Sequence, residues 1–184
     1  MKNLDLAALR ELWPRATFVA FDFETTGLDG RNDRIVEIGA LRFGPEGEGE
    51  AFQTLVDPGR PIPWQASRVN GISDAMVRGQ PDLESALPRF LAFAGGAVLV
   101  AHNAPFDLGF LRAGLARLGL RVPANPTADT CALARLALPR RRSYSLQNLA
   151  SDFRIDPGSA HRALDDARVC AKLVPLIVAG TERA

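Results

Sequence analysis

The stretch at residues 18–27, Phe-Val-Ala-Phe-Asp-Phe-Glu-Thr-Thr-Gly, most constrains how this chain can fold. Its apolar and aromatic first half is typical of a strand inside a sheet. Because strand side chains alternate between faces, we expect Asp22 and Glu24 on one side and Phe21 and Phe23 on the other. Two like charges at the end of a buried strand are costly unless cations neutralise them. Taken alone, the stretch is as compatible with ordinary surface acids as with a functional site.

Apolar runs separated by turn residues define the other expected elements. The run at 97–101 is fully apolar, which is typical of a strand in the middle of a sheet covered on both faces. The order of strands and helices predicts an α/β fold, a mixed sheet flanked by helices in one domain over 17–184, after an N-terminal helical extension at 1–16. We expect strands at 17–24, 34–43, 50–56, 97–101 and 127–129, and helices at 4–13, 82–94, 105–118, 130–138, 145–153 and 162–178, with two short helical pieces flanking a turn at 70–73.

Composition limits the class of protein more than it identifies a function. Of the 184 residues, 47% are hydrophobic and 23% charged, as in soluble globular proteins. The apolar runs are far shorter than a membrane span and residues 1–5 carry no secretory signal, so we expect a cytoplasmic protein without membrane association. Cys131 and Cys170 are expected to be free buried thiols, since a zinc site needs more partners. A net charge of +1 does not by itself indicate a polyanionic partner.

Three separated segments place polar groups at the ends of apolar elements. The first contains Asp22 and Glu24, the second follows the strand at 97–101 and leads to Asp107, and the third has His161 followed by two acids. Each has a structural explanation when taken singly. Acids in a first helical turn complement the helix dipole, and a lone histidine is most often a capping or surface residue.

In this order, the three segments resemble the motifs of the DnaQ-like (DEDDh) 3′–5′ exonuclease family. The resemblance is carried by Asp-Phe-Glu at 22–24, His-Asn-Ala-Pro-Phe-Asp at 102–107 and His-Arg-Ala-Leu-Asp-Asp at 161–166, and it spans residues 17–175. It implies a ribonuclease H-like fold with a five-stranded mixed sheet. It also implies removal of nucleotides from the 3′ end of DNA, in proofreading or repair, with two divalent metal ions. The proofreading ε subunit of bacterial DNA polymerase III belongs to this family, so a DNA polymerase is an implied partner.

The resemblance assigns four carboxylates to the metal ions. Asp22 would bridge both ions, Glu24 and Asp166 would lie on the side of the attacking water, and Asp107 would serve the second ion. Oxygen ligands alone favour Mg²⁺ or Mn²⁺. In a two-metal site the ions activate water and stabilise the attacking and leaving oxygens. His161 would be the general base, a role that suits histidine.

The spacing after His161 leaves two candidates for the last carboxylate. On a regular helix His161 and Asp165 share a face, whereas Asp166 lies about 140° further around the axis. Periodicity therefore favours Asp165, and the five-residue offset of the family selects Asp166. If His161 lies in a loop before the helix, the periodicity argument does not apply. We take Asp166 as the ligand and Asp165 as the alternative.

Substrate contacts follow from the same resemblance. Leu28 would wedge against a base, and Phe106 would stack on one, although Phe106 is almost as well explained as a core residue. Asn103 would orient its turn or touch the substrate. Asn70 stands where the family often has histidine, which leaves a contact there open. The expected substrate-binding residues are Thr25, Thr26, Gly27, Leu28, Asn103 and Phe106.

Two other functions remain open from the residues. An exoribonuclease that trims RNA ends would use the same site, because only contacts to the 2′-hydroxyl distinguish the two polymers. An inactive module that binds nucleic acid or a polymerase is the second alternative. All five catalytic residue types are present, which favours an active enzyme.

Overall fold

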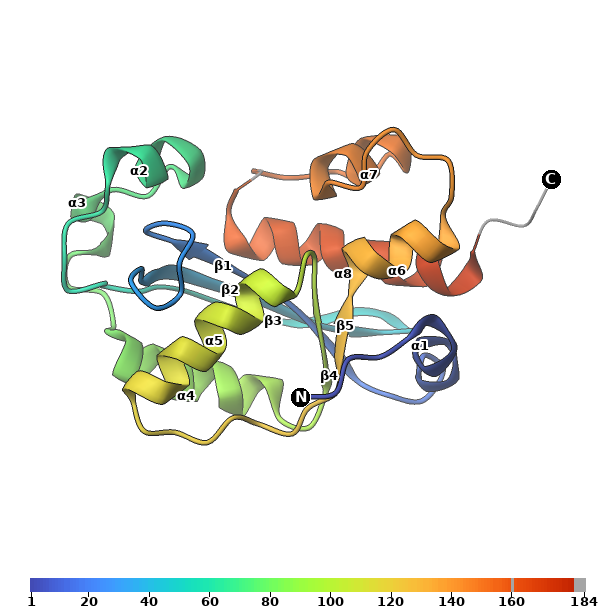
Figure 1. Cartoon of the computed structure of the whole chain (residues 1–184), viewed down its shortest axis with the longest axis horizontal. Helices are drawn as coiled ribbons and strands as arrows, with labels where there is room; N and C mark the ends of the chain where they lie inside the picture. The colour runs from blue at the N-terminus through green and yellow to red at the C-terminus, as the bar shows by residue number, and fades with distance from the viewer. Residues whose placement is uncertain (160, 181–184) are drawn as a thin grey trace.

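A five-stranded mixed sheet forms the middle layer of the protein (Figure 1). The computed structural model describes residues 1–159 and 161–180. Ala160, which precedes His161 in the third predicted motif, and residues 181–184, at the end of the predicted domain, lie outside the described residues. The strands are β1 (Phe18–Thr25), β2 (Ile35–Gly44), β3 (Gly47–Leu55), β4 (Val98–Ala101) and β5 (Thr127–Asp129).

The strand order is β3-β2-β1-β4-β5. The pairs β1–β2 and β2–β3 are antiparallel, and the pairs β1–β4 and β4–β5 are parallel. All four residues of β4 are buried, as expected for an apolar central strand. The predicted fold class, α/β with a five-stranded mixed sheet, is confirmed.

Helices cover both faces of this sheet (Figure 1). One core joins a face of the sheet to α1, α6, α7 and α8, and a second core joins the opposite face to α4 and α5. None of the helices in the described part of the chain combines the length and the apolar character that a membrane span requires. The helices are α1 (Leu6–Leu12), α2 (Trp64–Asn70), α3 (Asp74–Val77), α4 (Leu83–Ala94), α5 (Pro105–Arg117), α6 (Thr130–Ala137), α7 (Leu146–Asp152) and α8 (Ala163–Ala179).

Two elements begin two or more residues away from the predicted position. β3 begins at Gly47, because the glycine-rich segment pairs with β2 through its main chain, whereas its composition favours a turn. α1 begins at Leu6, since the residues before it add to the edge of the sheet. The Leu4 N–H donates to the Thr127 carbonyl (2.7 Å), and the Thr127 N–H donates to the Lys2 carbonyl (2.8 Å). The N-terminal segment therefore pairs with β5 at the edge of the sheet.

The sheet brings three chain segments to the end of β1. β4 runs parallel to β1, so the turn that leads into α5 lies at the same edge of the sheet as Thr25. α8 crosses β2 so closely that a β-carbon on Gly39 would clash with the backbone of Ala163 and Leu164. The end of β1, the start of α5 and the start of α8 therefore converge.

Candidate active site

The two acids of β1 face α8. Phe18 and Ala20 belong to the core on the α8 side, and Phe21 and Phe23 belong to the core under α4 and α5. Asp22 and Glu24 follow Phe18 and Ala20 at intervals of two residues, so they lie on the α8 face of the strand, as predicted. Glu24 is buried, whereas Asp22 is partly exposed to a cavity.

Asp107 reaches β1 from the first turn of α5. Pro105 begins this helix, a position in which its missing N–H costs nothing. Asp107 is only 1% exposed, and its Oδ1 accepts a hydrogen bond from the Phe23 N–H (3.0 Å). The carboxylate of α5 is thus fixed directly to the strand that carries the other two acids.

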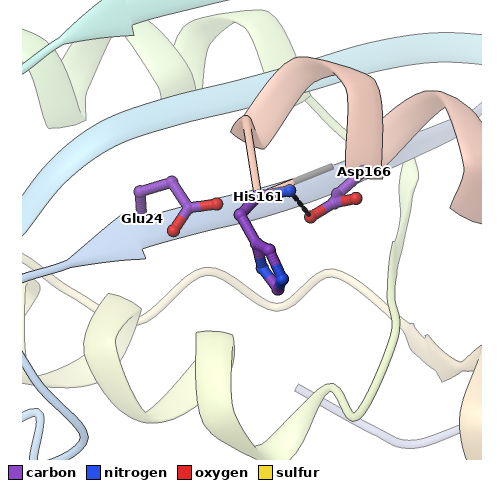
Figure 2. Close-up of side chains that lie close together, drawn as sticks. All are labelled: Glu24, His161 and Asp166. Carbon is purple, nitrogen blue, oxygen red and sulfur yellow. Dashed lines mark hydrogen bonds between the residues drawn. The ribbon is translucent and has the colours of Figure 1, made fainter. Parts of the chain in front are cut away.

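His161 lies before α8 and not within it. It has a φ of 62°, which a helix does not allow, and its main-chain N–H donates to Asp166 Oδ2 (3.2 Å). Figure 2 shows its side chain beside Glu24 of β1, with Asp166 on the first turn of α8. Ligand atoms of Glu24, His161 and Asp166 all lie within 4.8 Å of one another. Because His161 is outside the helix, periodicity does not decide between the two acids that follow.

Asp165 has partners of its own outside the cavity. Its carboxylate accepts from the Ser159 N–H (3.0 Å) and pairs with Arg168 (2.9 Å). Asp166 lines the cavity, and Asp165 is not among the described residues that line it. The cavity therefore brings together His161 and Asp166, which are five residues apart, as in the family motif.

Burial and neighbouring charges act on all four carboxyl groups. Burial, followed by the charges of Asp107, Glu24 and Asp166, raises the pKa of Asp22 well above its ordinary value of 3.8. Burial is also the largest cause that raises the pKa of Asp107 and of Asp166. For Asp166 the charge of His161 opposes this effect. The cluster thus disfavours its own ionisation.

Glu24 shows the same effect with partial compensation. Burial first, and then the charges of Asp166 and Glu37, raise the pKa of Glu24 from 4.5 to about 7. Arg162 and a hydrogen bond from Asn70 lower it, but by less. Glu24 therefore keeps its proton between pH 4.5 and about 7, where an ordinary glutamate loses it.

The cluster has the composition of a divalent-cation site. Within residues 1–159 and 161–180, no lysine or arginine forms an ion pair with Asp22, Glu24, Asp107 or Asp166. Buried carboxylates without a cationic partner are unfavourable, and an external cation removes that cost. Carboxylate oxygens are the ligands of hard cations such as Mg²⁺ and Mn²⁺. The residues present fit such ions.

A cavity of about 430 Å³ opens over this cluster. Among the described residues, Asp107 and Asn103 are not part of its lining. Asp107 lies against the β1 backbone instead, and the Asn103 N–H donates to Asp129 Oδ1 (3.0 Å) in the turn after β4. The lining consists of Asp22, Phe23, Glu24, Thr25, Thr26, Gly27, Leu28, Gln65, Ala66, Val69, Asn70, Phe106, His161 and Asp166.

The loop after β1 supplies one wall of the cavity. The Thr25 hydroxyl donates to the Gly27 carbonyl (2.6 Å), and the Thr26 hydroxyl donates to Asp33 (3.1 Å), so both hydroxyls hold the turn itself. A β-carbon on Gly27 would collide with the Asp33 carboxylate. Leu28 is 87% exposed at the end of this wall. The turn is held by its own side-chain hydrogen bonds and presents one apolar side chain to the outside.

Helix α2 supplies the opposite wall, which the sequence prediction missed except for the open question at Asn70. Gln65, Ala66 and Val69 line the cavity from this helix. Asn70 is buried, donates from Nδ2 to the Thr25 carbonyl (3.3 Å) and accepts from the Ile72 N–H (3.0 Å). A buried amide at the end of a short helix needs hydrogen-bond partners, and this need is the signal that indicates a contact between α2 and the end of β1.

The comparison with protein families decides what kind of site this is. A family model described as Exonuclease (RNase T) matches residues 19–174. The chain belongs to this exonuclease family. Membership confirms the predicted enzyme class, an exonuclease, and the matched segment includes all three predicted motifs.

Relatives of this exonuclease domain include replication proteins. It is 44% identical over 164 residues to the DNA polymerase III subunit epsilon of Treponema pallidum, covering 88% of this chain and 76% of that protein. It is 40% identical over 157 residues to the PolC-type DNA polymerase III of Clostridium perfringens. That match covers 85% of this chain and only 11% of the polymerase.

Solved structures show the same fold. A structure of Exonuclease X in complex with 5′ overhanging duplex DNA matches with a TM-score of 0.71 and 32% identity, over 88% of this chain and 91% of that one. E. coli Exonuclease I in complex with a dT13 oligonucleotide matches with a TM-score of 0.78 and 21% identity, over 89% and 41% of the two chains. The predicted ribonuclease H-like fold is confirmed.

Proposed function

We propose that this exonuclease-family protein releases nucleoside monophosphates from the 3′ end of DNA, in proofreading or repair. The observation that carries the proposal is the meeting of Asp22, Glu24, Asp166 and His161 at one cavity, with no arginine or lysine of the described residues paired to these acids. Similarity to an epsilon subunit of DNA polymerase III and to Exonuclease X bound to duplex DNA supports DNA as the substrate.

Two divalent ions, Mg²⁺ or Mn²⁺, complete the proposed site. Asp22 would contact both ions, Glu24 and Asp166 would hold the ion nearest to His161, and Asp107 would serve the other. Bound ions would activate water and stabilise the charge that develops on the phosphate. The raised pKa of Glu24, about 7, supports this assignment, because a bound cation lowers the cost of ionising the carboxylates.

His161 is proposed as the general base. Its main-chain N–H holds Asp166, and its exposed side chain is free to meet a water molecule at the cavity. A base must come within hydrogen-bond reach of the proton that it removes. The proximity of His161 to Glu24 and Asp166 supports this role (Figure 2).

The rest of the cavity would hold the terminal nucleotide. The loop at 25–28 and Phe106 would contact it, with Leu28 against the base. Phe106 also packs against Phe110, with ring centroids 5.1 Å apart, so it joins the cavity to the core. Asn103 would act on the substrate only through the turn that it holds. We further propose a cytoplasmic location and a DNA polymerase as partner, given the replication proteins among its relatives.

Digestion of 3′-labelled and 5′-labelled substrates tests the proposal. Single-stranded DNA, duplex DNA, mismatched duplex and RNA are incubated with Mg²⁺, with Mn²⁺ or with EDTA. We expect mononucleotide release from the 3′ end of DNA that EDTA abolishes. Faster cleavage of RNA would shift the assignment to RNA trimming, and no cleavage of any polymer would contradict an enzymatic role.

Two variants exclude a contaminating nuclease. Asp22→Ala should lower activity by about 10³-fold or more, because the loss of several kcal/mol of metal-dependent stabilisation corresponds to that factor. His161→Ala should lower it by about 10²-fold, the usual effect of losing a general base. Both variants should keep the wild-type circular dichroism spectrum. Full activity in Asp22→Ala would contradict the proposed site.

A further inference from the structure

Glu37 of β2 is the most completely partnered carboxylate near the cavity. It is fully buried and lies opposite Glu24 in the β1–β2 register. Its Oε1 accepts from Arg162 Nη2 (2.8 Å) and from Gln53 Nε2 (2.8 Å). Its Oε2 accepts from Arg162 Nε (3.1 Å) and from the Ala163 N–H (3.2 Å). Four hydrogen bonds therefore converge on one side chain, and three of them come from the start of α8.

Glu37 caps α8 from another element of the fold. The N-cap residue of this helix, Arg162, makes no side-chain hydrogen bond to the helix N–H groups. The first N–H groups of a helix have no partner within the helix and favour an anionic acceptor. The Ala163 N–H finds that acceptor in Glu37. A side chain of the sheet therefore helps to fix where α8 begins.

The residues held in this way are those next to the proposed chemistry. Arg162 directly follows His161, and its carbonyl accepts from the Asp166 N–H (3.0 Å). His161 is held in a backbone conformation with φ of 62°, which is uncommon for a residue other than glycine. Such a conformation persists only where its surroundings determine it. Arg162, which donates two hydrogen bonds to Glu37, is the residue directly after His161.

Packing alone does not explain a charged pair at this position. Glu37 is fully buried and loses its hydration, whereas the Arg162 side chain stays 34% exposed, and apolar residues in place of such a pair are often equally stable. What the pair adds is direction, because the planar guanidinium binds a carboxylate in one orientation. The close approach of α8 to Gly39 on the same strand further limits sliding of the helix.

We propose that Glu37 is a positioning residue, which through Arg162 and Ala163 fixes His161 and Asp166 over the cavity. The inference rests on the proposed exonuclease function and adds to it a role for β2. Glu37 contacts neither substrate nor metal in this account. It holds the base and the last carboxylate in place in the metal-free protein, so that ion binding does not have to order them.

The test is Glu37→Gln, which keeps the shape of the side chain and removes the charge that binds Arg162. We expect kcat on 3′-labelled DNA to fall about 10-fold, the lower end of the usual effect of losing such a supporting contact. KM should change less than about twofold. Arg162→Lys, which loses the two-point contact, should behave alike. Glu50→Gln is the matched control, because Glu50 of β3 also pairs with an arginine, Arg42, but on the surface.

A double-variant cycle separates positioning from general stability. If Glu37 acts mainly through His161, its effect should shrink from about 10-fold to less than about threefold in the His161→Ala background. A 10-fold loss that persists both in that background and in an Asp166→Asn background would overturn the inference. An active wild type with an equally active Glu37→Gln variant would overturn it as well.

A readout without activity keeps this inference distinct from the proposed function. In EDTA, hydrogen exchange at the Ala163 and Asp166 amides should become faster in Glu37→Gln, with little change in α4. Unchanged exchange at these amides would contradict the inference even if the wild type digests DNA. Faster exchange in Glu37→Gln, together with a wild type that digests no polymer, would contradict only the exonuclease function.

Discussion

Glu24 and Glu37 face each other across β1 and β2, and their surroundings differ. Glu37 receives four hydrogen bonds, two of them from Arg162. Glu24 has no ion pair with any described residue, and burial with nearby carboxylates raises its pKa to about 7. At the same depth of one sheet, the protein neutralises one carboxylate itself and leaves the other without an ion pair to any described residue.

The same contrast recurs between consecutive residues of α8. Asp165 pairs with Arg168 and with the Ser159 N–H, whereas Asp166 faces the cavity and His161. A carboxylate that the protein has already satisfied is a structural element. One that remains among like charges in a cavity indicates function, because its cost has to be offset by a ligand.

The largest expected difference is in the activity of the α8 pair. Asp166→Asn should lower kcat/KM on single-stranded DNA about 10²-fold, since it removes a proposed metal ligand. Asp165→Asn should lower it less than about threefold, because the amide keeps an acceptor for the Ser159 N–H. A larger loss in Asp165→Asn than in Asp166→Asn would reverse the assignment.

The glutamate pair should respond in opposite directions when stability is measured. In EDTA at pH 8, Glu37→Gln should lower the midpoint of thermal unfolding by about 5 °C, because it leaves Arg162 without its anionic partner. Glu24→Gln should raise it by about 3 °C, because it removes a charge from an acidic cluster. Differential scanning calorimetry measures both. Destabilisation by both substitutions would break the contrast between the two residues.

The pH dependence of stability provides a smaller effect with a defined sign. The pKa of Glu24 is about 7 in the folded protein and 4.5 ordinarily, so below pH 4.5 it is protonated in both states. Between pH 4.5 and 7 the unfolded chain loses this proton and the folded protein keeps it, which lowers the free energy of unfolding. The metal-free protein should therefore unfold at a lower temperature at pH 7.5 than at pH 5.

Glu24→Gln is the control for this pH effect. The variant should show a weaker fall of the unfolding midpoint with pH, because one of the groups with a raised pKa is gone. Mg²⁺ or Mn²⁺ added to the wild type at pH 7.5 should restore part of the loss. A wild-type midpoint that stays constant or rises between pH 5 and 7.5 in EDTA would contradict the assigned shift.

Much of the fold could be predicted because it follows from local patterns. The alternation around Asp22 gives the face on which the acids lie, and the apolar run at 97–101 gives the central strand. The start of β3 was predicted wrongly, since its pairing depends on β2 and not on its own glycine-rich composition. Sequence patterns show what a segment prefers, and edge strands depend on their neighbours.

The site was predictable only in part, for the same physical reason. The choice between Asp165 and Asp166 depends on where α8 begins, and Glu37, which lies on a strand far away in the sequence, helps to set that point. The wall formed by α2 depends on the contact of Asn70 with the end of β1. Contacts between residues far apart in the chain leave no local pattern, apart from a buried polar residue that requires a partner.

We propose that Asp22, Glu24, Asp107 and Asp166 together bind two divalent cations. Anomalous scattering from a crystal soaked in Mn²⁺ with a nucleoside monophosphate tests this directly. We expect two manganese peaks in contact with these carboxylates, with Asp22 touching both. A bound nucleotide without manganese, or four carboxylates that point to different places, would contradict it.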